Sequence, residues 1–175
     1  MDKNIKILLD KINIDEDSYQ YFNDAKITKI KVSSKDNSWN IFITKDELLP
    51  VEIYEELESK KMTLDSNASK IEFIFDIKNP NLDKYLSYYK YLLKLLKDDL
   101  KVQELYENSM QIEDDFLVLV ATNEVEKEHL TKCLPKISEF YKKIDYNLNI
   151  EIKLHHENNI LEEIQNDLAN TVMPE

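Results

Sequence analysis

Any chemistry in this chain would have to come from a few scattered polar residues. His129 and Cys133 lie four residues apart, a spacing that places two soft metal ligands on one face of a helix. A structural zinc site needs about four such ligands, but the sequence holds one cysteine and three histidines. We therefore interpret His129 and Cys133 as packing residues of an amphipathic helix.

Two further clusters contain residue types that bind metals. His155-His156-Glu157 follows a predicted strand, but the sequence lacks the HExxH spacing of zinc proteases there. Glu113-Asp114-Asp115 supplies adjacent carboxylates, whereas two-metal phosphoryl transfer needs carboxylates that converge from separate strands. We expect this acidic cluster to form a solvated hairpin turn. The sequence thus predicts no catalytic residue, no metal ligand and no cofactor for the chain itself.

The composition argues against phosphate and nucleotide sites. Glycine is absent, and all 23 basic residues are lysines, so arginine is absent as well. Without glycine the chain cannot build Gly-rich phosphate loops, and without arginine it lacks the bidentate guanidinium fork. The formal net charge of −12 repels a phosphate backbone at long range. Nucleotide binding and nonspecific DNA binding are therefore disfavoured.

Several features indicate a cytoplasmic protein. No hydrophobic run approaches the roughly 20 residues needed to span a bilayer. Residues 1–11 are too charged for a signal peptide, and the single cysteine cannot form an intramolecular disulfide. The hydrophobic fraction of 42% is ordinary for a globular protein, so we expect the chain to fold as one domain or two small ones.

A strand followed by a helix organises the first half. Trp39 and Ile41 fall on one side of a predicted strand because they alternate with Asn40. Pro50 suits the first turn of a helix, in which polar and apolar residues recur at helical spacing. We predict a core with Trp39 at its centre, made of Trp39, Ile41, Tyr54 and Leu57. An exposed Trp39 that stacks on a nucleic-acid base is the alternative.

The remaining elements follow from the same two periodicities. We predict helices at 5–12 and, capped by Asp15 or Asp17, at 17–22; a hairpin of strands 26–33 and 38–44; and a strand at 70–76. In strand 26–33, Ile30 and Val32 would face inward and Lys29 and Lys31 outward. The second half predicts helices at 82–96, 100–106, 125–144 and 160–168, with strands at 110–112, 116–121 and 148–154. Pro135 should kink or split its helix.

The element order predicts an α+β fold class with two small domains. Each half reads helix, helix, strand, strand, helix, strand, which indicates an internal repeat of shape with a three-stranded sheet in each copy. The predicted divisions are an N-terminal α+β domain at 1–79, a second domain at 80–156, and a C-terminal helix or linker at 157–175. By topology the second domain is KH-like and resembles the N-terminal domain of DnaA and the C-terminal domain of the clamp-loader tau subunit, both chiefly protein-docking modules.

The first half also resembles a known family over about residues 5 to 60. The resemblance is carried by Ile7-Leu8-Leu9, Ile14, Asp17, Tyr21-Phe22, Ile27, Ser38-Trp39, Leu48-Leu49-Pro50 and Ile53-Tyr54. These segments resemble the N-terminal region of the PolC-type DNA polymerase III alpha subunit of Gram-positive bacteria. The resemblance implies a parent DNA-directed DNA polymerase with a 3′–5′ proofreading exonuclease. Its OB-fold domain, catalytic domains and magnesium ions would then lie beyond this stretch.

Two functions remain open on this basis. The resemblance favours a non-catalytic module that docks the polymerase to replisome proteins such as the clamp-loader tau subunit, the clamp, or primase and helicase components. Tyr88, Tyr91 and Leu95 would form the docking surface, unless their helix is instead wedged between the two halves. The alternative is a nucleic-acid-binding accessory module that uses the outward lysines Lys26, Lys29 and Lys31. An enzyme in its own right is the least favoured reading.

Overall fold

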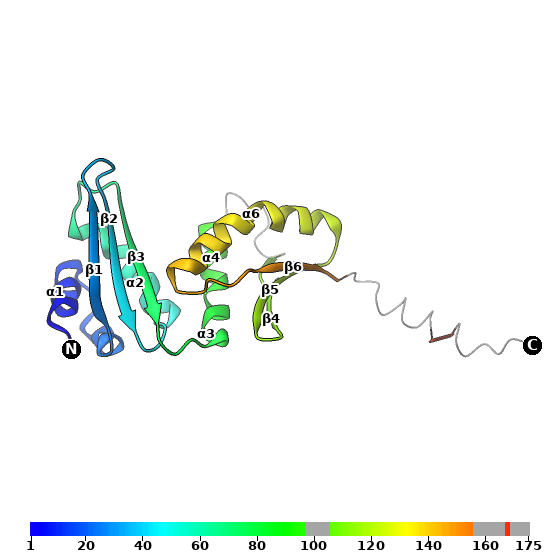
Figure 1. Cartoon of the computed structure of the whole chain (residues 1–175), viewed down its shortest axis with the longest axis horizontal. Helices are drawn as coiled ribbons and strands as arrows, with labels where there is room; N and C mark the ends of the chain where they lie inside the picture. The colour runs from blue at the N-terminus through cyan, green and yellow to red at the C-terminus, as the bar shows by residue number, and fades with distance from the viewer. Residues whose placement is uncertain (97–105, 156–166, 169–175) are drawn as a thin grey trace, which may run out of the picture.

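Two three-stranded sheets of the same topology form the frame of the molecule (Figure 1). The computed structural model describes residues 1–96, 106–155 and 167–168. The strand orders are β1-β2-β3 and β4-β5-β6. In each sheet the first pair is antiparallel and the second pair is parallel. The α+β class and the two three-stranded sheets predicted from the sequence are confirmed.

The first module comprises the elements that build the β1-β2-β3 sheet. They are α1 (Lys3–Ile12), η1 (Glu16–Phe22), β1 (Lys26–Ser33), β2 (Ser38–Lys45), α2 (Val51–Lys60), η2 (Lys61–Leu64) and β3 (Lys70–Ile77). Asp2 caps α1 through its side chain, and Asn13 ends that helix in the left-handed region at a φ of 59°. Asp15, one of the two predicted caps, accepts the backbone N–H of Asp17 at the start of η1.

Strand alternation divides the first sheet into a buried and an open face. Ile41 and Ile43 in β2 are buried, as are the alternate residues of β3 from Ile71 to Ile77. Tyr54 and Leu57 of α2 are also buried. Trp39 is only half-buried and packs at the rim of this core, so the core is not centred on it. The fully buried aromatic ring of α2 is Tyr54.

Two apolar side chains of β1 depart from the expectation. Ile30 pairs with Ile41 and Val32 with Trp39, so both face the helical side of the sheet. Nevertheless Ile30 is 49% exposed and Val32 is 59% exposed. The predicted inward direction is therefore confirmed, but neither side chain is buried, because β1 is the edge strand of the sheet.

The second module comprises the elements that build the β4-β5-β6 sheet. They are α3 (Leu82–Ser87), α4 (Tyr89–Leu95), β4 (Met110–Glu113), β5 (Phe116–Ala121), α6 (Glu124–Lys143) and β6 (Glu151–Leu154). The predicted helix over 82–96 is interrupted at Tyr88, which ends α3 and precedes α4. The last strand is shorter than predicted and starts at Glu151 instead of 148. The helices predicted at 100–106 and 160–168 lie largely outside the described residues.

Helix α6 continues through Pro135 without being split. It runs for 20 residues from Glu124 to Lys143. Proline is disfavoured inside helices because it removes one backbone donor and crowds the preceding turn. Pro135 and Thr131 both lie on the exposed side of α6, so solvent can satisfy the carbonyl that loses its helical partner. Neither α6 nor any other helix in the described part of the chain is long and apolar enough to cross a membrane.

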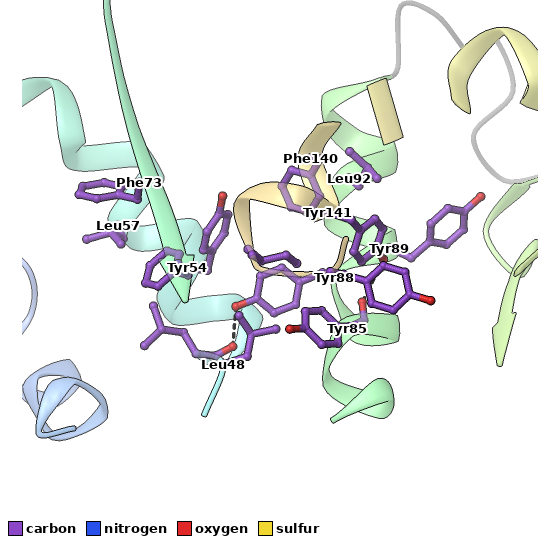
Figure 2. Close-up of a cluster of buried hydrophobic side chains, with 14 of the residues drawn as sticks. Leu48, Tyr54, Leu57, Phe73, Tyr85, Tyr88, Tyr89, Leu92, Phe140 and Tyr141 are labelled. Carbon is purple, nitrogen blue, oxygen red and sulfur yellow. Dashed lines mark hydrogen bonds between the residues drawn. The ribbon is translucent and has the colours of Figure 1, made fainter. Parts of the chain in front are cut away.

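The two modules share one hydrophobic core (Figure 2). The ring of Tyr54 from α2 lies 5.2 Å from that of Tyr88 and 6.0 Å from that of Phe140 in α6. The Tyr88 hydroxyl donates to the backbone carbonyl of Leu49 in the first module. A polar contact supports the same junction, because the Ile77 N–H donates to the Asp145 carboxylate at 2.9 Å. The boundary expected near residue 80 therefore separates two sheets but not two cores.

Candidate protein and nucleic-acid interfaces

A β-bulge places three lysines of β1 on one face of the sheet. Lys26 pairs with Thr44, Lys29 with Phe42, and the register shifts between Ile27 and Lys29. Paired residues in a sheet point to the same side, and positions 26 and 29 would face opposite sides in a regular strand. The extra residue in the bulge brings Lys26 and Lys29 to the same side of the sheet. Lys26, Lys29 and Lys31 therefore form a row, called the lysine row below, on the open face.

The lysine row is positively charged, and two of its lysines lie over an aromatic ring. The ammonium groups of Lys29 and Lys31 lie 5.8 Å and 5.6 Å from the centre of the Phe42 ring. A hydrogen bond with Lys31, followed by charge repulsion, lowers the pKa of Lys29. No acidic side chain among the described residues forms an ion pair with Lys26, Lys29 or Lys31. The row can thus attract an external anion.

The opposite side of β1 borders an apolar groove. This groove, called the Trp39 groove below, has a volume of about 290 Å³ and lies between α1 and the edge of the sheet. Its lining includes Ile7, Lys11, Ile27, Ile30, Trp39 and Leu64. Ile7 is 45% exposed, although it lies on a helix whose other face is buried. This groove could not be predicted from the sequence, because helical periodicity alone assigns Ile7 to the solvent side without showing what lies beside it.

The predicted tyrosine docking surface is divided by burial. Tyr88 is fully buried between the modules, and Tyr91 is half-buried against Tyr54 and Phe140. Burial, followed by the charges of Glu58 and Glu55, raises the pKa of Tyr91 to about 12. Leu95 is 56% exposed. In this conformation Tyr88 is not available to a partner, so only Leu95 and one edge of Tyr91 remain accessible.

The acidic cluster 113–115 forms a hairpin turn, as predicted. Glu113 pairs with Phe116 at the end of β4 and β5, and Asp114 and Asp115 have φ values of 51° and 66°. Two successive residues with positive φ are typical of the tight turns that join antiparallel strands. The Glu113 carboxylate accepts a hydrogen bond from Lys153 of β6, and this bond lowers its pKa.

The histidines and the cysteine do not come together as a metal site. The Tyr106 hydroxyl lies 2.8 Å from Nδ1 of His129, and the side chain of Cys133 is buried in the core. The backbone N–H of His155 donates to Ala121, while His156 and Glu157 lie outside the described residues. Within the described ranges, no group of three or more His, Cys, Asp or Glu side chains is arranged to hold a metal ion.

An ion pair that the sequence did not single out fixes the chain where it leaves β2. Lys45 is almost fully buried and donates to the Tyr21 carbonyl at 2.6 Å and to the Asp24 carboxylate at 2.5 Å. Asp24 also accepts the backbone N–H groups of Asp46 and Glu47. A lysine at the position where an alternating strand requires an apolar residue was the available signal, since a buried lysine needs a partner.

The first module is similar to a known protein family. Residues 4–75 match the family described as DNA polymerase III polC-type N-terminus I. This range begins in α1 and ends within β3, so it covers nearly the whole first module. The resemblance seen in the sequence is thereby confirmed for that part of the chain. No curated protein and no solved structure matches the chain.

Proposed function

We infer from the match of residues 4–75 to the polC-type N-terminus that this chain is an N-terminal region of a PolC-type DNA polymerase III, and we propose that it docks the polymerase to another replisome protein. The parent enzyme would be a DNA-directed DNA polymerase with a 3′–5′ proofreading exonuclease. Its magnesium ions and catalytic carboxylates would belong to other parts of that protein.

A non-catalytic role agrees with the side chains on the described surface. The titratable groups with shifted pKa values are mainly core tyrosines and the carboxylates of ion pairs. Catalytic sites instead gather such groups around a cleft with a role for each. The exposed apolar side chain of Leu95, at 56% exposure, fits a protein contact better than chemistry.

We also propose that the second module is a KH-like docking module, similar to the N-terminal domain of DnaA and the C-terminal domain of tau. The support is its topology, in which an antiparallel β4–β5 hairpin is extended by a parallel β6. Helix α6 forms the connection between the parallel strands. Topology alone carries this proposal, because folds of one shape serve many functions.

The docking function is tested by binding to purified replisome proteins. The chain is immobilised and offered the clamp-loader tau subunit, the clamp, the primase and the helicase, each at physiological salt. We expect one of them to bind, and we expect Leu95→Glu to weaken that binding at least tenfold if the proposed tyrosine surface is the contact. Val125→Glu, an equally exposed apolar residue on α6, is the control. Absence of binding to every component would contradict the docking role.

The second candidate is nucleic-acid binding through the lysine row, and the bulge that aligns Lys26, Lys29 and Lys31 favours it. Phosphate contacts are identified by their salt dependence, since each neutralised phosphate releases bound counterions. Under this alternative, single-stranded DNA would bind at low salt and lose affinity steeply between 50 and 200 mM salt, on the order of tenfold or more for a few contacts. The affinity of a partner that docks on an apolar surface would change little over the same range of salt.

A further inference from the structure

We propose that the outer edge of β1 accepts an extended, acidic and amphipathic segment of a partner protein as a fourth strand of the first sheet. This inference rests on the proposed docking function and specifies a surface and a partner chemistry for it. It concerns a surface separate from Leu95 and Tyr91, which lie on α4. Three independent features of β1 support it.

The first feature is the free hydrogen-bonding edge. β1 is the terminal strand of the order β1-β2-β3 and, among the described residues, pairs with β2 alone. Half of the backbone N–H and C=O groups of an edge strand point away from the sheet and can pair with an added strand. All four residues from Lys29 to Val32 are exposed, and their register with β2 is regular. This segment is therefore straight and accessible.

The second feature is the exposed apolar side of the same segment. Ile30 and Val32 face the helical side of the sheet, where Ile30 lines the Trp39 groove and Val32 pairs with Trp39. At about 290 Å³ the groove is at or below the lower limit of small-molecule pockets, which span about 300–1,000 Å³. It is lined mainly by aliphatic side chains and Trp39. Such a groove suits one or two apolar side chains of a peptide better than a cofactor.

The third feature is the charge on the other side. The lysine row projects from the open face, and its members form no ion pair among the residues that the structure describes. Residues directly opposite on neighbouring strands interact through their side chains, and opposite charges there are favourable. A fourth strand would thus place acidic residues against Lys29 and Lys31 and apolar residues beside Ile30 and Val32.

Charge also argues against a second copy of this chain as the occupant. Antiparallel pairing of two β1 edges would bring the lysine row of one copy against that of the other. Like charges directly opposite each other destabilise a strand pair. Lysines and bulges also protect edge strands from unwanted pairing. If the edge needed only protection from pairing, polar residues in place of the exposed Ile30 and Val32 would protect it better.

The first experiment identifies the occupant by selection. A displayed library of random ten-residue peptides is selected on the intact chain and counter-selected on the variant Lys29→Glu/Lys31→Glu. We expect enrichment of sequences in which acidic and apolar residues alternate with a period of two. Enrichment of helical spacing, of basic residues, or of no pattern at all would overturn the proposal.

The second experiment tests the backbone pairing. The strongest selected peptide is synthesised twice, with N-methyl groups on one alternating set of residues or on the other. N-methylation removes a hydrogen-bond donor, so only the set that faces β1 should lower affinity, by at least tenfold. Equal effects of the two sets would contradict strand addition.

Variants of the chain then test the two faces separately. Ile30→Lys and the double change Lys29→Glu/Lys31→Glu should each weaken peptide binding at least tenfold. The matched controls Val125→Lys and Lys132→Glu/Lys142→Glu, on α6, should leave it unchanged. Circular dichroism confirms that each variant is folded. Unchanged affinity in the folded β1 variants would refute the proposed surface.

The outcomes separate this inference from the proposed function. If a replisome protein binds but the β1 variants do not affect it and no alternating peptide is selected, docking holds and the fourth-strand proposal fails. If single-stranded DNA binds with the same dependence on Lys29 and Lys31 and no peptide does, the nucleic-acid candidate replaces it. If the chain forms dimers that Ile30→Lys dissociates, a second copy is the occupant and the proposal is wrong.

Discussion

Hydroxyl groups in the shared core differ in whether they have a partner. Tyr88 donates its buried hydroxyl to the Leu49 carbonyl, whereas the buried hydroxyl of Tyr85 has no hydrogen-bond partner among the described residues. An unpaired buried polar group lowers stability by about 1–3 kcal/mol. We therefore expect Tyr88→Phe to reduce the free energy of unfolding by about that amount.

Tyr85→Phe is the matched control because it removes a hydroxyl of the same kind from the same helix pair. Its free energy of unfolding should be unchanged or higher, since no bond is lost and an unpaired polar atom is removed. Urea unfolding of both variants measures the difference. A similar loss of stability in both would show that the Leu49 contact contributes nothing.

The pairing of Asp24 with Lys45 predicts a pH dependence. Burial by itself would raise the pKa of Asp24, but the hydrogen bonds from Lys45 and from the backbone lower it overall. A carboxyl group whose pKa is depressed by folding contributes stability that is complete above its unfolded pKa of about 3.9. That contribution is lost as the pH falls through the folded value. Urea unfolding should therefore show stability decreasing below about pH 5, and less steeply for Asp24→Asn.

Asp36, in the exposed turn between β1 and β2, provides the comparison for Asp24. The variant Asp36→Asn should keep the full decrease of the unmodified chain, because Asp36 forms no ion pair among the described residues. If Asp24→Asn behaves like Asp36→Asn, the buried ion pair does not control acid stability.

At the scale of single elements, Pro135 lowers the stability of α6. Proline in a helix interior is about 3 kcal/mol less favourable than alanine. Pro135 is exposed, so little burial compensates for the lost hydrogen bond. We expect Pro135→Ala to raise the free energy of unfolding by about 1–3 kcal/mol, measured by urea. Lys132→Ala on the same helix should change it by less than about 0.5 kcal/mol.

Trp39 is at the rim of the core, which lowers the expected effect of its removal. Truncating a fully buried aromatic residue to alanine reduces stability by about 3–5 kcal/mol. Because Trp39 is half-buried, Trp39→Ala should reduce stability by about half of that, whereas Tyr54→Ala should reach the full range. Equal losses in urea unfolding would place Trp39 back at the centre of the core.

Periodicity in the sequence predicted most of the elements but not their surroundings. The face of α1 with Ile5 and Leu8 and the alternation in β2 could be predicted because each depends on a local repeat. The exposure of Ile30 could not be predicted, since it depends on β1 lying at the edge of the sheet. The break at Tyr88 follows from contacts with the first module, which local helix propensity does not contain.

The candidate surfaces were predicted less completely than the fold. The outward direction of the lysine row could be inferred from the sequence, although Lys26 reaches that face only through the bulge. Tyr88 could not be separated from Leu95 by sequence, because both lie in a stretch rich in tyrosine and leucine. Only the packing of the two modules decides which of them solvent reaches.

At the scale of the whole molecule, the continuous core predicts cooperative unfolding. Trp39 lies in the first module, so its fluorescence reports on that module alone. Leu130 is fully buried in α6 of the second module. We expect Leu130→Ala to lower the urea midpoint detected by Trp39 fluorescence as much as that detected by circular dichroism. An unchanged fluorescence midpoint would show that the two modules unfold independently.

The Tyr54, Tyr88 and Phe140 junction also has a mechanical consequence. A linker between independent domains would stretch first under tension and shield both domains. Here the helices of the two modules pack directly on each other, because the Tyr54 ring contacts those of Tyr88 and Phe140, and the Ile77 N–H donates to Asp145. A force applied to one module would therefore turn both modules together like a rigid lever.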